Sequence, residues 1–179
     1  MLRITIPSQK AWDSDNEEFI ETKEYKLQLE HSLVSISKWE SKWHKPFLST
    51  EEKSIEEVID YIRCMTLTQN IDPKVYMFLT AENIEQINEY IEDPMSATTF
   101  SDGNRQLSKE IITSEIIYYW MITFNIPLEC QKWHISRLMT LIKVCSIKNS
   151  PQKRMSANEI LNRNRELNEY RKKKLNTKG

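Results

Sequence analysis

Apolar side chains recur every three or four residues along most of the chain beyond residue 31. Because an α-helix turns once in about 3.6 residues, this spacing gathers them on one face of a helix. The first such run contains Leu33, Ile36 and Trp43, with either Trp39 or Glu40 on the same face. The repeat therefore predicts a mainly α-helical fold.

Later segments carry the same repeat, and local signals mark where their helices begin. Ser49 with Glu52 matches a capping box, Thr80 suits an N-cap, and Pro127 suits the first position of a helix. The predicted stripes are Ile55, Val58, Ile59, Ile62 and Met65; Ile84, Ile87 and Ile91; and Ile135, Leu138, Leu141, Ile142 and Cys145. Residues 111–124 are apolar nearly all round, which predicts the most buried helix of the fold. A short helical turn is predicted from Pro73.

The N-terminal segment has a different repeat. Apolar and polar residues alternate in 2–6 and again in 25–29, and this alternation is typical of strands with one buried face. We expect the two to pair as a small β-hairpin, with a polar, acidic link between them. A two-stranded hairpin is only marginally stable alone, so it must pack on the helices.

Charge divides the chain into a helical domain with its hairpin, residues 1–149, and a basic C-terminal helix or tail, residues 150–179. From Lys148 onward ten basic residues face three acidic ones, a net +7, so the preceding 147 residues carry −8 of the overall −1. Ser156 with Glu159 predicts the start of the last helix, which has no continuous apolar stripe and is expected to project from the body. Such asymmetry indicates an electrostatic binding arm or head-to-tail self-association.

Composition excludes several classes of function. Two glycines in 179 residues do not supply a phosphate-binding loop or a dinucleotide fingerprint, so no nucleotide cofactor is expected. No run of about 18 apolar residues is present and the first residues lack a secretory pattern, which favours a protein without a membrane span. Three widely spaced cysteines, Cys64, Cys130 and Cys145, suit a reducing cytoplasm.

Cys130 and His134 are four residues apart on one predicted helix, a spacing that would present a thiolate and an imidazole to a single metal ion. A structural zinc site needs four ligands, and no second pair of this kind exists, so we expect no metal. An enzyme using the same two residues as nucleophile and base is the least favoured reading, because no catalytic motif accompanies them. We therefore predict no catalytic residues.

The candidate partner-binding residues are aromatic or basic. Tryptophan combines a large apolar ring with an N–H that needs an acceptor, so core or interface anchoring is favoured over cofactor stacking for Trp39, Trp43, Trp120 and Trp133. The cluster Arg171, Lys172, Lys173 and Lys174 would contact phosphates in a nucleic-acid reading, but an acidic body and few interleaved aromatics favour a protein-contacting arm. The predicted partner-binding set is Trp39, Trp43, Trp133, Arg171, Lys172, Lys173 and Lys174.

Several stretches together resemble one family, the tail assembly chaperones of long-tailed (siphovirus-type) bacteriophages. They are LEHSL at 29–33, SKWESK at 37–42, KPF at 45–47, ITSEI at 112–116, YYWM at 118–121, IP at 126–127 through Cys130, WH at 133–134, RL at 137–138, and the closing segments 155–168 and 171–179. The resemblance covers most of the chain from about residue 24 onward and lies in an overall pattern, not in catalytic motifs.

The resemblance implies a helical, non-enzymatic protein that acts in the host cytoplasm during virion morphogenesis and is absent from the finished particle. Such proteins are thought to coat the tape measure protein, keep it soluble and help to recruit tail tube subunits. Several phages make a short and a longer form by ribosomal frameshifting, so the resemblance implies homo-oligomers or association with a longer form. It implies no cofactor and no established site residues.

The residues fit such a role on physical grounds. A client with a long apolar helical face aggregates unless it is covered, and several weak contacts give avidity while each remains reversible. Amphipathic helices with Trp, Tyr and Met side chains suit adaptable binding of this kind. The alternative from another class is a nucleic-acid-associated phage or host regulator that uses the basic tail.

Overall fold

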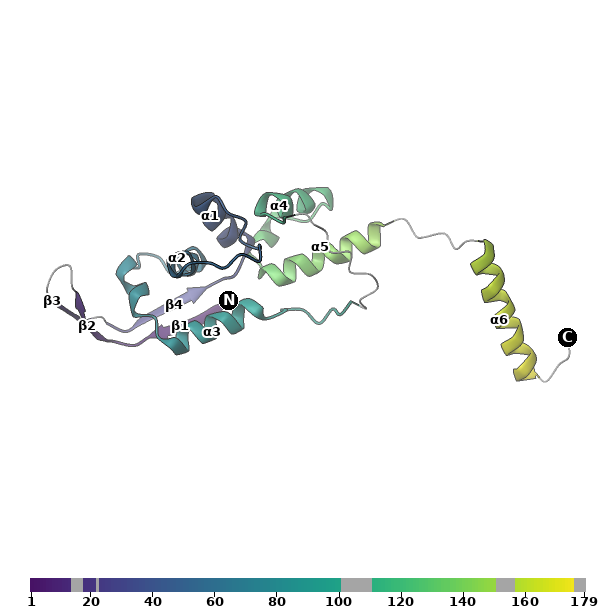
Figure 1. Ribbon diagram of the computed structural model, residues 1–179, viewed down its shortest axis with the longest axis horizontal. Helices are drawn as coiled ribbons and strands as arrows, with labels where there is room; N and C mark the ends of the chain where they lie inside the picture. The colour runs from purple at the N-terminus through teal and green to yellow at the C-terminus, as the bar shows by residue number, and fades with distance from the viewer. Residues whose placement is uncertain (14–17, 22, 101–110, 151–156, 176–179) are drawn as a thin grey trace. The chain divides into compact units, whose positions relative to one another are not determined.

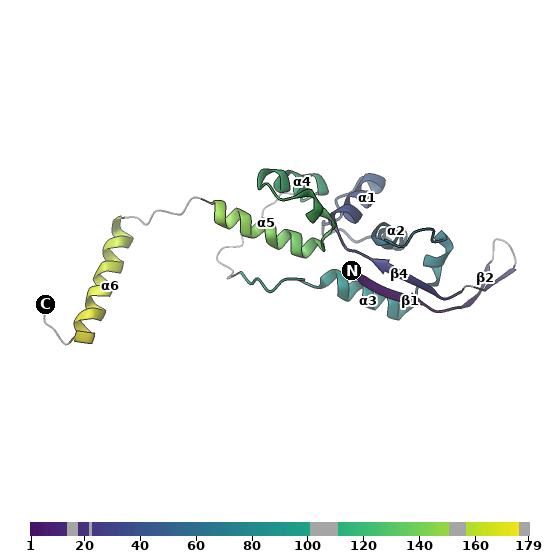
Figure 2. The same ribbon diagram turned by 180° about the vertical axis from the view of Figure 1, so that it is seen from behind.

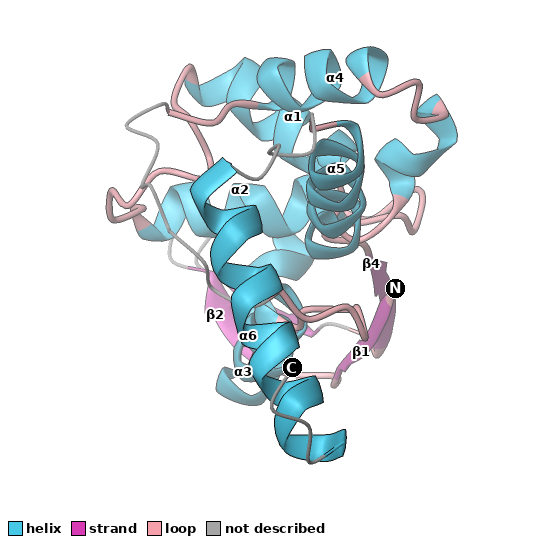
Figure 3. Cartoon of the chain, turned by 90° about the vertical axis from the view of Figure 1, so that its right-hand side faces the viewer, coloured by secondary structure: helices cyan, strands magenta, loops and turns pink. Residues whose placement is uncertain are grey.

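The computed structural model describes residues 1–13, 18–21, 23–100, 111–150 and 157–175. Its elements divide into two compact units, Met1–Ser146 and Ile147–Gly179, with α5 crossing the boundary (Figure 1). In order they are β1 (Leu2–Ile6), β2 (Lys10–Asp13), β3 (Glu18–Glu21), β4 (Tyr25–Leu29), α1 (Leu33–Trp43), α2 (Ile55–Met65), the 3-10 helix η1 (Pro73–Phe78), α3 (Ala81–Glu92), α4 (Ser114–Thr123), the 3-10 helix η2 (Leu128–Lys132), α5 (Ile135–Asn149) and α6 (Ala157–Leu175). The fold is mainly α with an N-terminal hairpin, as predicted, and helices dominate Figure 3.

The hairpin forms from the two strands predicted. β1 and β4 pair antiparallel, with Ile4 opposite Leu27 and Leu2 opposite Leu29. Ile4, Ile6, Leu27 and Leu29 are buried because alternation places all four on the face that meets the helices. α3 packs along β1, and Figure 2 shows the same arrangement from behind.

The link between these strands was expected to be only a polar, acidic connection, but it contains two further strands. β2 and β3 form a second antiparallel ladder, in which Lys10 faces Glu21 and Asp13 faces Glu18. The two chains that leave the first ladder are already adjacent and antiparallel, so pairing continues with little further loss of chain entropy. A search for apolar alternation misses a ladder of this composition.

α1 begins and ends where the sequence indicates. Ser32 is its N-cap, with reciprocal hydrogen bonds between Ser32 and Ser35 that satisfy two backbone N–H groups. His44 ends the helix in the left-handed region, with φ of 54°, and its N–H bonds the carbonyl of Glu40 at 2.8 Å. Trp39 and Glu40, predicted as alternatives for the inner face, are both buried.

α2 starts later than predicted and turns differently. Its capping box is Ser54 with Glu57, not Ser49 with Glu52. Ile55 is 79% exposed and Val58 is also exposed, so the predicted stripe is wrong at these two positions. The acidic residue Glu57 is buried in their place.

Aromatic and basic groups from α1 and the following turn explain why the polar side of α2 faces inward. The indole N–H of Trp39 donates to the carbonyl of Glu57 at 2.9 Å, and that of Trp43 donates to the carboxylate of Asp60 at 2.9 Å. Lys45 lies 2.6 Å from the Glu57 carboxylate. This hydrogen bond, with a second from Ser54, holds the pKa of Glu57 below its usual value. These hydrogen bonds and the Lys45–Glu57 ion pair therefore determine which side of α2 faces the core.

η1 and α3 follow the prediction. η1 begins at Pro73, and Thr80 forms a capping box with Asn83 at the start of α3. Ile87 is buried on the inner face of α3. The side-chain amide of Asn83 also donates to the carbonyl of Thr5 in β1 at 3.2 Å, which fixes α3 along the hairpin.

The helix predicted from Pro127 onward is interrupted. η2 ends at Lys132, and α5 begins at Ile135 after an extended pair, Trp133 and His134. His134 forms an isolated antiparallel bridge with Ser32, and the N–H of Ile135 bonds the carbonyl of His31 at 2.8 Å. This pairing with the start of α1 takes the backbone groups that a continuous helix would have used.

Beyond this break the predicted α5 stripe is confirmed. Ile135, Leu138 and Ile142 are buried, and Leu141 and Cys145 pack against the core. The C-terminal unit contains α6, whose proposed capping pair, Ser156 with Glu159, lies outside the described residues. Within the described ranges, none of the helices is both long and apolar enough to cross a membrane.

Candidate protein-binding surface

The outer face of α4 exposes two large apolar side chains of the N-terminal unit. Of its ten residues only Ser114, Ile117 and Met121 are buried. Tyr119 is 64% exposed and Ile122 is 69% exposed. The prediction that this segment forms the most buried helix is therefore wrong. Apolar residues occur on every side of the segment, but only three of the ten helical residues are buried, and Tyr118 and Trp120 pack against the core while remaining partly exposed.

A residue from α1 holds the start of α4 in place. Among the described residues, the N-cap Thr113 makes no side-chain cap hydrogen bond. Instead the carboxylate of Glu40 accepts the N–H of Ser114 through Oε2 at 2.8 Å and the N–H of Phe47 through Oε1 at 2.8 Å. A buried carboxylate at a helix N-terminus satisfies an otherwise unpaired donor and complements the helix dipole. α4 is thus anchored at its base while its outer face stays exposed.

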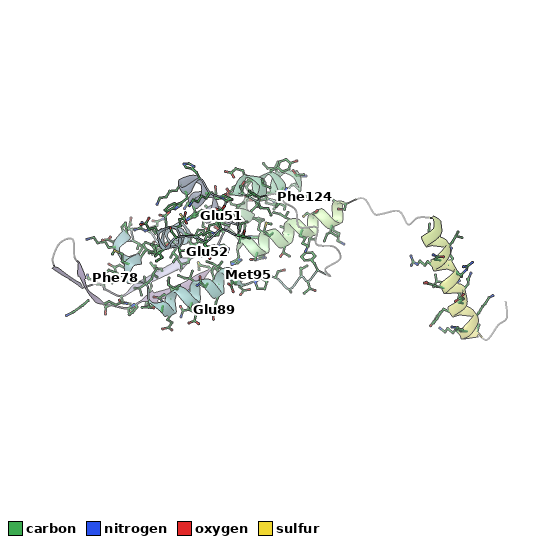
Figure 4. The ribbon with its side chains drawn as sticks, viewed as in Figure 1. Glu51, Glu52, Phe78, Glu89, Met95 and Phe124 are labelled. Carbon is green, nitrogen blue, oxygen red and sulfur yellow. The ribbon has the colours of Figure 1, made fainter. Side chains whose placement is uncertain are left out.

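A groove of about 610 Å³ lies between α4, α5 and the chain that follows α3. Its lining is Phe100, Trp120, Phe124, Met139, Thr140, Ile142, Lys143 and Ser146. Phe124 lies between α4 and α5 in Figure 4. The Nζ of Lys143 lies 3.9 Å from the centre of the Phe100 ring, so a cation and an aromatic ring are in contact in the lining of the groove. Trp120 was predicted to be a core or interface anchor, whereas no spacing in the sequence predicts this groove.

Of the predicted tryptophans, Trp39 belongs to the core. Its side chain is 1% exposed, and its ring stacks near that of Trp43 with centres 6.2 Å apart. Its indole N–H is satisfied within the fold, which fits the anchoring role but removes Trp39 from an accessible binding surface. Trp43 is half-buried and also bonded internally, to Asp60. Burial alone would raise the pKa of Asp60, but hydrogen bonds from Lys42 and Trp43 lower it overall.

Trp133 lies elsewhere, between η2 and α5. It is half-buried, and the guanidinium carbon of Arg137 lies 4.3 Å from the centre of its ring. The structure therefore does not bring Trp133 together with Trp39 and Trp43 in one patch: the latter pair stacks within α1 against α2.

Cys130 and His134 do not share a helix, because the chain breaks between η2 and α5. Both are buried. Across residues 1–13, 18–21, 23–100, 111–150 and 157–175, no group of three or more His, Cys, Asp or Glu side chains is placed to hold a metal ion.

His134 belongs instead to a buried polar cluster with His31. The two imidazole rings are 5.0 Å apart, and Nδ1 of His31 bonds the hydroxyl of Tyr61. In His134, Nδ1 accepts the N–H of Ser136 at 3.3 Å, so Nε2 carries the proton and donates to the carbonyl of Tyr90 at 2.9 Å. No local pattern predicts this cluster, because its members come from four separate segments.

Electrostatics keep both imidazoles neutral. Burial, followed by the nearness of His134, lowers the pKa of His31 to about 3. Burial also lowers the pKa of His134 and raises that of Tyr61. Neutral, buried groups that are hydrogen-bonded to one another join α1, α2, α3 and α5, so we assign the cluster a structural role.

The predicted basic cluster lies on α6. Arg171, Lys172, Lys173 and Lys174 are all exposed on this helix. Consecutive residues on a helix point in directions about 100° apart, so the four do not form a single face. This geometry separates Lys173 in particular from Arg171 and Lys172.

No protein-family model, curated protein or solved structure matches this chain. The geometry and the chemistry of its surfaces are therefore the basis on which a function is inferred.

Proposed function

We propose that this chain is a non-enzymatic tail assembly chaperone of a long-tailed bacteriophage. In this proposal it binds the tape measure protein, keeps it soluble during tail morphogenesis in the host cytoplasm, and helps to recruit tail tube subunits. The observation that carries the proposal is the outer face of α4, where Tyr119 and Ile122 are exposed on a helix that is anchored at its base. Apolar side chains at the surface of an anchored helix suit a partner that brings its own apolar helical face.

The groove beside α4 supports the same role. Trp120, Phe124 and Met139 offer aromatic and thioether surface, which adapts to different apolar side chains at low cost. A long client would meet many copies of such a surface, so each contact can be weak while the whole client stays covered. Association of several copies, or with a longer frameshifted form, belongs to the same proposal.

Co-expression tests the proposal directly. The tape measure protein of the same phage is expressed with and without this chain, and its share in the soluble fraction is measured. We expect the soluble share to rise severalfold when the chain is present. An equally insoluble tape measure protein in both cultures rejects the chaperone function.

A matched pair of variants tests whether α4 is the surface used. Ile122→Glu removes an apolar contact whose full burial contributes roughly 1.5–3 kcal/mol, so binding should weaken about tenfold or more. Ile55→Glu makes the same change at a residue that is 79% exposed on α2. We expect only the α4 variant to lose solubilisation. Equal activity of the two variants would place the client elsewhere.

One observation favours a second candidate, a nucleic-acid-associated regulator: the four cations Arg171 to Lys174 are all exposed. Titration of duplex and single-stranded DNA at two salt concentrations tests it. Binding that weakens steeply with salt and disappears when residues 164–179 are deleted supports this candidate.

A further inference from the structure

α6 carries a face of its own. At about 3.6 residues per turn, Ile160, Leu161, Leu167 and Leu175 fall on one side of the helix, and Asn164, Asn168 and Arg171 lie among them. All four apolar side chains are exposed. The stripe is narrow and is interrupted by two amides and by the cation Arg171, which explains why the sequence shows no continuous repeat there.

Charge on α6 is arranged around this stripe. Arg165 and Lys172 border it on one side, and Arg163 and Lys174 border it on the other. The carboxylates Glu166 and Glu169 lie on the opposite side of the helix, as does Lys173. The positive charge of α6 is therefore directional, with cations along both edges of the apolar stripe and the acids behind it.

We propose that this face of α6 docks a partner protein whose contact surface has an apolar centre between two acidic rims. The leucines offer apolar contact, and cations along both edges of the stripe attract carboxylates, so both features point to one kind of surface. This inference goes beyond tail assembly: it concerns a second surface and holds whichever client binds α4.

Two other occupants fit the face less well. A second copy of α6 would set Arg165 and Lys172 against the cations of its twin, and like charges across a helix pair repel. A nucleic acid would use the cations but leave Leu161 and Leu167 without a role, because phosphates are contacted by charge and hydrogen bonds. The apolar centre therefore favours a protein.

Binding also explains how α6 is stabilised. A helix of 19 residues with every described side chain exposed is marginally stable alone. Contact with a partner along the stripe would add the apolar packing that a single exposed helix lacks. We therefore expect the helicity of α6 to rise on binding.

The probe is a synthetic helical peptide with leucine at heptad positions a and d and glutamate at e and g. Its control has lysine in place of every glutamate. Binding to the full-length chain is measured by fluorescence anisotropy and helicity by circular dichroism. We expect the glutamate peptide to bind at least tenfold more tightly than the lysine peptide, with a gain of helical signal. Equal binding of the two peptides, or no binding of either, overturns the proposal.

Two neighbouring lysines supply the sharpest control. Lys172→Glu reverses a charge at the edge of the stripe, and Lys173→Glu makes the same reversal on the far side of the helix. We expect the first to weaken peptide binding at least tenfold and the second to change it less than about twofold. Leu167→Ser should weaken binding to a similar degree as the first.

The same variants distinguish nucleic acid from protein. If α6 instead serves nucleic acid, duplex DNA binds more tightly than the glutamate peptide, both lysine variants lose affinity equally, and Leu167→Ser has no effect. That pattern, or equal losses of peptide binding in the two lysine variants, rejects the proposal. Circular dichroism of each variant confirms that the N-terminal unit remains folded.

Discussion

Glu40 links α1 to the helix that carries the exposed apolar face, across 74 residues of sequence. Glu40→Gln keeps the shape of the side chain but replaces one acceptor oxygen with an NH₂ donor. Whichever way the amide turns, either Ser114 or Phe47 loses the acceptor for its backbone N–H. A hydrogen bond to a charged group contributes about 1.5–3 kcal/mol, and the surviving bond loses its charge assistance. We therefore expect the free energy of unfolding to fall by about 2–4 kcal/mol, against a typical total of about 5–15 kcal/mol.

Denaturant unfolding followed by tryptophan fluorescence measures this loss. The matched control is Glu85→Gln, which makes the same chemical change on the exposed side of α3 and should cost less than about 0.5 kcal/mol. Amide hydrogen exchange adds a local readout, because the N–H of Ser114 should lose protection in the Glu40 variant. If Glu40→Gln unfolds at the same denaturant concentration as Glu85→Gln, the carboxylate does not anchor α4 and the reasoning fails.

Three further perturbations test the packing around α1. Acidification should destabilise the fold, because the unfolded chain protonates His31 near pH 6.5 whereas the pKa of His31 in the folded protein is about 3. The free energy of unfolding should then fall by about 1.4 kcal/mol per pH unit below about 6.5. Denaturant titrations at pH 7 and pH 5 measure this loss, and the difference between the two should be smaller in His31→Gln. Trp39→Phe removes the indole donor from the carbonyl of Glu57 and leaves space in the core, so calorimetry should show a loss of about 2–4 kcal/mol. Tyr90→Phe removes a 2.6 Å hydrogen bond to Glu30, and urea unfolding should show a loss of about 1–3 kcal/mol; no change would mean that solvent replaces the hydroxyl.

Sequence signals predicted those features of the fold that depend only on residues close together in the chain. The alternation in β1 and β4 fixed both strands, and Thr80 and Pro73 correctly marked the starts of α3 and η1. Such signals work because a cap or an alternating face needs only the next few residues to act.

Other features depend on partners that are distant in sequence. The inward side of α2 is decided by Trp39 and Trp43, whose indoles need the Glu57 carbonyl and the Asp60 carboxylate. The break before α5 arises because His134 pairs with the start of α1. Periodicity counts apolar residues, so it cannot register a polar group that becomes buried through a distant hydrogen bond.

The candidate site was predicted only in part. The sequence correctly placed the basic residues on a last helix, but it could not separate Lys172 from Lys173 without the helix geometry. It placed Trp39 on a binding surface because tryptophan is common there, whereas the structure uses that ring in the core. Phe100 and Met139 both line the groove beside α4, and no spacing in the sequence predicts that they share it.

Exposed apolar residues on α4 could bind a client, or they could simply be tolerated at the surface, and their arrangement favours binding. Single exposed apolar side chains are common and require no partner. Tyr119 and Ile122, however, lie together on one side of α4, and the groove lined by Trp120 and Phe124 lies on another side of the same helix, so α4 presents two apolar surfaces. If that surface served pairing between copies instead, Ile122→Glu would yield a monomer while leaving the tape measure protein soluble. A variant that stays as associated as the wild type, yet no longer solubilises the client, would assign the face to the client alone.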